Sequence, residues 1–166
     1  MLSCSELKHV DVIYLTEHWQ SEQKLNCTGT VDFWLVGAFC RSSSEHGGSG
    51  IYVKDCLVTK EINYFAGINE EKIFEMSLIE LPAYQLCAVC IYRSPHGQFD
   101  KFLDKLELVV QKLLMEDKIL ILCGDWNIDF FHESSNQKDL TDLLLRYYLV
   151  NTVKSPTRTT KKQAHC

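Results

Sequence analysis

The chain has 166 residues, a length that suits one domain with a single sizeable core. Hydrophobic residues make up 46% of it and charged residues 23%, and no apolar run approaches the ~20 residues that a membrane span needs. The N-terminus has no basic segment followed by an apolar stretch, so we expect no secretory signal. The net charge of −5 is unusual for a protein that binds nucleic acid, although a bound metal ion can neutralise a substrate phosphate locally.

The eight cysteines do not follow the pattern of a disulfide framework. Cys87, Cys90 and Cys123 lie inside apolar runs, where free cysteine commonly acts as a small buried hydrophobe. Cys87 and Cys90 are three residues apart, so on a strand they point to opposite faces and cannot converge on one metal. We therefore expect reduced thiols and an intracellular protein.

The first half of the chain predicts strands, because it is rich in short apolar runs separated by turn residues. We expect Trp34 in the core, and a loop rich in Ser and Gly at 42–50. The predicted strands cover 10–15, 33–39, 51–53, 57–64, 73–81 and 84–92.

In the second half the apolar period changes. Phe99 to Leu114 carries one apolar stripe at helical spacing, which predicts a helix of about four turns. The run 118–123 is typical of a central strand covered on both faces. Asn136 is positioned to cap a second helix that extends to Tyr147, and 149–153 predicts a last short strand. Many strands and two helices indicate an α/β protein with mixed sheets, in one domain over 1–166.

Polar residues follow two of these predicted strands. Glu17 ends the first, and Asp125 with Asn127 follows the run 118–123. Ligands of open sheets bind outside the carboxyl ends of strands, and carboxylate oxygens suit a hard cation such as Mg²⁺. Each residue alone also has a plainer explanation, because an Asp after a strand often caps a turn and a Glu can be an exposed strand end.

Four motifs together carry a resemblance. Leu15–Trp19 resembles the Glu-Thr-Trp motif of the endonuclease/exonuclease/phosphatase superfamily, with His18 where Thr is usual. Gly124–Asn127 resembles its Gly-Asp-Phe-Asn motif, the segment 90–95 resembles its strand-ending Tyr motif, and 155–159 resembles its Pro-Thr-Arg segment. The sequences around Gly47 and Tyr92 further resemble those of endonuclease domains of insect-type non-LTR retrotransposons. The resemblance implies a four-layer α/β sandwich with two mixed β-sheets flanked by helices, incomplete at both termini.

The resemblance also implies roles. Glu17 matches the metal-binding glutamate, and the metal would be Mg²⁺, with Mn²⁺ as an alternative. Tyr92 matches the tyrosine on the scissile phosphate, Asp125 the aspartate that activates water, and Asn127 the asparagine beside it. Thr157 and Arg158 match a segment that binds the phosphate.

The implied reaction is nicking of DNA by water, in the nucleus if the chain is part of a retroelement protein. The family's supporting Asn, late Ile-Asp motif and Ser-Asp-His motif have no match here. We therefore expect this sequence to correspond to the middle of such a domain, with weak or absent activity and marginal stability. The alternatives are a phosphatase acting on a small substrate and an inactive retroelement remnant. We expect no membrane association, and the oligomeric state is open.

Overall fold

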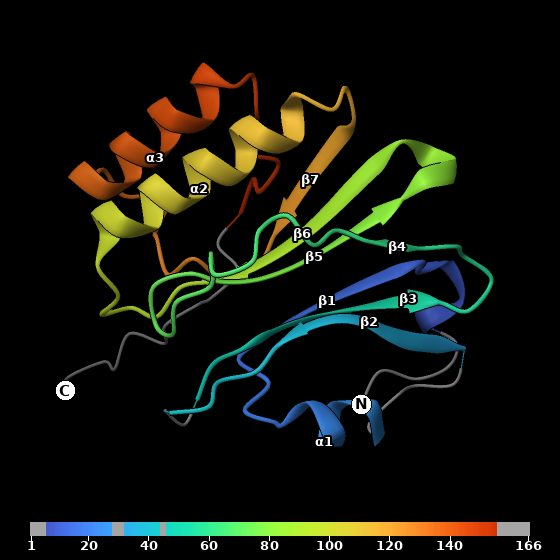
Figure 1. Ribbon diagram of the computed structural model, residues 1–166. Coiled ribbons are helices and arrows are strands. Elements are labelled where there is room, and N and C mark those ends of the chain that lie inside the picture. Colours follow the sequence, from blue (N-terminus) through green and yellow to red (C-terminus); the bar gives the residue numbers. More distant parts are fainter. Residues whose placement is uncertain (1–5, 28–31, 44–45, 156–166) are drawn as a thin grey trace, which may run out of the picture. The chain divides into compact units, whose positions relative to one another are not determined.

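The computed structural model describes residues 6–27, 32–43 and 46–155 (Figure 1). The chain divides into two compact units between Ile128 and Asp129, and each unit is described by itself. The expectation of one domain over 1–166 stays a prediction.

The first sheet of the N-terminal unit has three antiparallel strands in the order β1-β3-β2. These strands are β1 (Val12–Thr16), β2 (Phe33–Phe39) and β3 (Ser49–Lys54). The short helices η1 (Glu6–His9) and α1 (Glu22–Cys27) cover its outer face. There Leu7 packs with Phe33 and Tyr52, and the Tyr52 hydroxyl donates a hydrogen bond of 3.0 Å to the Leu25 carbonyl.

The second sheet has four strands in the order β4-β5-β6-β7. They are β4 (Lys60–Glu61), β5 (Glu75–Leu81), β6 (Leu86–Tyr92) and β7 (Ile119–Cys123), with the turn η2 (Pro82–Tyr84) between β5 and β6. β6 and β7 run parallel, and the helix α2 (Phe99–Leu114) makes the crossover that parallel neighbours require. The apolar stripe of α2 is buried as predicted, at Phe102, Leu106, Val109, Val110 and Leu113.

The core of this unit lies between the two sheets. Ile51 and Val53 of β3 meet Ile79 and Leu81 of β5, together with Ala88 and Cys90 of β6. The layers therefore run from α1 through the three-stranded and four-stranded sheets to α2 (Figure 1). The predicted α/β fold with two sheets flanked by helices is confirmed. The three-stranded sheet is antiparallel and the four-stranded sheet is mixed.

The C-terminal unit contains the helix α3 (Ser135–Arg146), whose buried residues are Leu140, Leu143 and Leu144. The predicted cap at Asn136 is wrong, because that residue lies inside the helix. Ser134 is extended and its hydroxyl accepts a hydrogen bond of 3.1 Å from the Gln137 N–H. The predicted strand at 149–153 is also wrong, since these residues have no strand geometry and Val150 is 76% exposed.

Three further expectations need correction. The predicted strand at 57–64 pairs only at Lys60 and Glu61. The run 118–123 was predicted to be a central strand, but among the described residues β7 lies at the edge of its sheet and pairs only with β6. Ile119 is accordingly 61% exposed. Trp34 is 68% exposed rather than in the core, because it lies near the start of β2, an edge strand of its sheet among the described residues.

The cysteine prediction agrees with the structure at Cys87 and Cys90, whereas Cys123 is only half-buried. Cys87 and Cys90 are both buried and both free, and only Cys90 belongs to the core between the sheets. No helix among the described residues is long and apolar enough to cross a membrane.

Candidate active site

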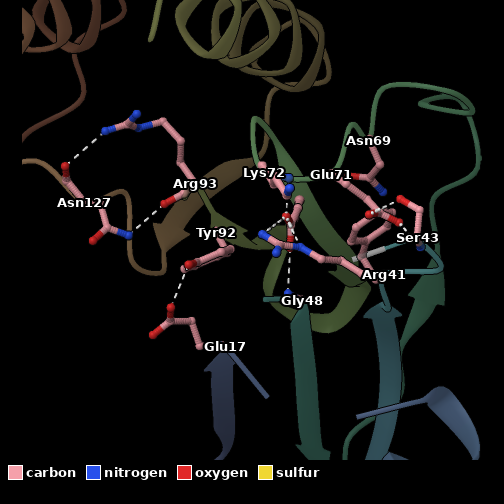
Figure 2. A network of polar contacts seen from close by, with 12 residues as sticks. Glu17, Arg41, Ser43, Gly48, Asn69, Glu71, Lys72, Tyr92, Arg93 and Asn127 are labelled. Carbon is pink, nitrogen blue, oxygen red and sulfur yellow. Dashed lines mark hydrogen bonds and ion pairs between the residues drawn. The ribbon is translucent and has the colours of Figure 1, made fainter. Parts of the chain in front are cut away.

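The carboxyl ends of β1 and β6 meet although they belong to different sheets. The Cys90 thiol donates a weak hydrogen bond of 3.5 Å to the Leu15 carbonyl, so the two strands lie against each other at this point. Two residues further along each strand, the Tyr92 hydroxyl donates a hydrogen bond of 2.6 Å to the Glu17 carboxylate (Figure 2). Glu17 is exposed, whereas only 2% of the surface of Tyr92 is accessible. The phenol therefore reaches from the core to a carboxylate at the surface.

Burial and the hydrogen bond to Glu17 raise the pKa of Tyr92 to about 12. Tyr92 is therefore protonated at neutral pH, and its hydroxyl can donate one hydrogen bond. The acceptor is the Glu17 carboxyl group.

The segment after β7 requires glycine at its first position. Gly124 has φ +130°, and a Cβ there would lie 1.9 Å from the Ile91 carbonyl oxygen. The chain then turns at Asn127, whose φ of 51° is left-handed. Asp125 stabilises this turn, because its Oδ1 accepts a hydrogen bond of 3.0 Å from the Asn127 N–H. Left-handed backbone at non-glycine residues is uncommon and concentrates at functional sites.

Arg93 holds this turn against β6. Its Nε donates to the Trp126 carbonyl at 2.9 Å, and its two terminal nitrogens donate to the carbonyls of Asn127 at 3.0 Å and Gly97 at 2.8 Å. In return, the Asn127 side-chain amide donates to the Arg93 carbonyl at 2.7 Å (Figure 2). Arg93 is 3% exposed, and its guanidinium lies over the rings of Phe99 and Phe102.

Burial lowers the pKa of Arg93, and the nearby Asp125 opposes that shift. Arginine retains its charge even with a lowered pKa, so its backbone contacts are charge-assisted.

The predicted site residues thus form two groups that are joined by the neighbours Tyr92 and Arg93. One group is Glu17 with Tyr92, and the other is Asp125 with Asn127. Thr157 and Arg158 lie outside the described residues. The sequence analysis missed Arg93, and it missed Glu75, a charged residue directly after Phe74 in the predicted strand 73–81. Such a charge is rarely buried without a partner, and that signal could have identified Glu75.

No protein-family model matches this sequence, and no curated protein matches it. The structure is similar to the endonuclease domain of TRAS1, a telomere-specific non-LTR retrotransposon. The TM-score is 0.63 at 15% identity, over 86% of this chain and 62% of that one. It is also similar to a humanized D. rerio TDP2 with 14 mutations, with a TM-score of 0.54 at 18% identity, over 82% of this chain and 56% of that one.

The chain therefore spans less than two thirds of the length of either structure. Identities this low establish a shared fold and leave the activity to be inferred from the site. The chain has the α/β fold of the endonuclease/exonuclease/phosphatase superfamily.

Proposed function

We propose that the chain carries part of a magnesium-dependent phosphodiesterase site that nicks DNA. The observation that supports this most is the hydrogen bond between Tyr92 and Glu17, residues 75 positions apart. It joins a phenol to a carboxylate at the strand ends where the Asp125–Asn127 turn also begins. Such hydrolysis needs a hydrogen-bond donor to the phosphate, a carboxylate that binds a cation and a carboxylate that activates water.

In the proposed reaction, Asp125 takes a proton from a water molecule. The oxygen of that water attacks the phosphorus in line, the bond from phosphorus to the opposite ester oxygen breaks, and the departing oxygen takes a proton from solvent water. When substrate binds, the Tyr92 hydroxyl would redirect its one hydrogen bond from Glu17 to a non-bridging phosphate oxygen, and Asn127 would keep Asp125 and the phosphate in register. Thr157 and Arg158 are proposed as further phosphate contacts.

The donor set is compatible with Mg²⁺. The described residues contain no group of three or more His, Cys, Asp or Glu side chains that could enclose a metal. Magnesium does not require such a cage, because it commonly binds one or two carboxylates and keeps waters and substrate oxygens. Glu17 is exposed and uses Oε1 to accept from Tyr92, so Oε2 can serve as the ligand. When bound, the ion would stabilise the charge that develops on the phosphate.

Nicking of supercoiled plasmid with and without Mg²⁺ tests the proposal. We expect slow Mg²⁺-dependent nicking that Asp125→Asn and Glu17→Gln abolish. Asp129→Asn, which removes an exposed carboxylate four residues further on, is the matched control and should have no effect. Nicking that is equal in wild type and Asp125→Asn would disprove the assignment. Hydrolysis of a small phosphate monoester without nicking would favour the phosphatase alternative, and absence of both would favour an inactive remnant.

A further inference from the structure

A buried carboxylate lies directly behind the Tyr92–Glu17 pair. Glu75 begins β5, is paired in register with Tyr92 of β6, and has no exposed surface (0%). Its Oε1 accepts hydrogen bonds from Arg41 Nε at 2.7 Å and from the Lys72 N–H at 2.6 Å, and its Oε2 accepts one from the Gly48 N–H at 2.6 Å. One side chain thus joins the start of β5 to the residues just before it and to two points, Arg41 and Gly48, of the connection between β2 and β3.

One branch of this network leads to Glu17. The Gly48 N–H donates to Glu75, and the Gly48 carbonyl accepts a hydrogen bond of 3.0 Å from the Glu17 N–H. Glu17 has a left-handed backbone, with φ of 53°, which needs support from its surroundings. Gly48 has φ +94°, and a Cβ there would lie 2.2 Å from His18 Nε2, so glycine is required at this link.

The other branch leads to Tyr92. Arg41 pairs with Glu75 at 2.6 Å, and its guanidinium lies 5.7 Å from the centre of the Tyr92 ring (Figure 2). The side chains of Arg41 and Glu75 are 6% and 0% exposed. The Glu75 carboxylate therefore supports the backbone of Glu17 through Gly48, and it also holds Arg41 against the ring of Tyr92.

Stability alone does not account for this arrangement. Removing two charges from water commonly costs as much as their attraction returns, and apolar side chains often replace such pairs without loss. We propose that Glu75 is a positioning residue, which holds Glu17 through Gly48 and Tyr92 through Arg41 in the geometry that the phosphodiesterase site requires. This proposal rests on the proposed function for its purpose, but its geometry can be tested without metal or substrate.

The test is amide hydrogen exchange of the metal-free protein, read at Gly48 and Glu17. Glu75→Gln removes the charge, and Glu75→Asp keeps it but shortens the side chain, so that it cannot reach Arg41 and Gly48 together. Glu80→Gln is the matched control, because Glu80 is a buried carboxylate at the other end of β5 that pairs with Lys118 at 3.0 Å. Mg²⁺ titration of the same variants is the second readout.

We expect both Glu75 variants to speed exchange at Gly48 and at Glu17 by roughly tenfold, as for the loss of one strong hydrogen bond, and to weaken Mg²⁺ binding. Glu80→Gln should leave both unchanged. If Glu75→Gln does not fold, Glu75→Asp alone decides. Faster exchange at Gly48 with no change at Glu17 would overturn the proposal. Faster exchange at both amides in a protein that binds no Mg²⁺ would support the positioning role and refute the proposed function.

Discussion

The substitution Arg93→Lys tests whether the planar shape of the guanidinium, and not only its charge, stabilises the turn that carries Asp125 and Asn127. The guanidinium donates hydrogen bonds to three carbonyls, of Gly97, Trp126 and Asn127, at 2.8 to 3.0 Å. A hydrogen bond to a charged group contributes about 1.5–3 kcal/mol, and a buried carbonyl left without a donor costs about 1–3 kcal/mol. Lysine keeps the charge, but a single ammonium cannot match three acceptors arranged around a planar fork.

We expect two of the three contacts to be lost and the free energy of unfolding to fall by about 3 kcal/mol, since such contributions are not additive. Urea unfolding, followed by circular dichroism, measures it. Arg146→Lys, at an exposed arginine near the end of α3, is the matched control and should change the free energy by less than about 0.5 kcal/mol. Equal unfolding free energies for Arg93→Lys and wild type would refute the idea that the planar guanidinium organises the turn.

Three further predictions concern Gly124, Tyr92 and the cysteines. Gly124→Ala should lower the free energy of unfolding by about 3 kcal/mol or more, because the new Cβ would lie 1.9 Å from the Ile91 carbonyl oxygen; an unchanged urea midpoint would contradict this. Burial raises the pKa of Tyr92 from 10.0 to about 12, so the unfolded chain loses this proton at a lower pH than the folded protein, and the free energy of unfolding should fall as the pH rises from 10 to 12. Tyr92→Phe should make that fall shallower, and an unchanged slope would contradict the pKa shift. A thiol reagent at neutral pH should label exposed Cys56 quickly but Cys90 only after unfolding, since burial raises the pKa of Cys90 to about 12, and mass spectrometry of the labelled peptides measures both.

The sequence predicted elements best where many residues repeat one period. Phe99–Leu114 carries a long apolar stripe, and its helix has the predicted bounds. The segment 57–64 offered only a short apolar pattern, and just two of its residues pair. The run 118–123 appeared to be covered on both faces, yet Ile119 is exposed because neighbours in space, which a single strand's pattern does not specify, decide its burial.

The candidate site was predictable to the extent that its residues end strands. Glu17, Tyr92, Asp125 and Asn127 all follow or end apolar runs, and the structure joins them through short contacts. Arg93 could not be assigned in this way, because its partners are backbone carbonyls, which leave no trace in the sequence. Glu75 differs, because it is a charged residue directly after Ile73 and Phe74 in a predicted strand, and a charge that is buried there needs a partner.

Arg93 and Glu75 act on different halves of the site, and this allows a test of their independence. Arg93 contacts the turn at Trp126 and Asn127, while Glu75 contacts Gly48 and Arg41. Glu75 begins β5 and Arg93 follows the adjacent strand β6, but they share no hydrogen-bonding partner among these contacts. We therefore expect Arg93→Lys and Glu75→Asp to have additive effects on the free energy of unfolding within about 0.5 kcal/mol. A coupling energy above about 1 kcal/mol in the double-mutant cycle would mean that the two halves form one cooperative unit through Tyr92.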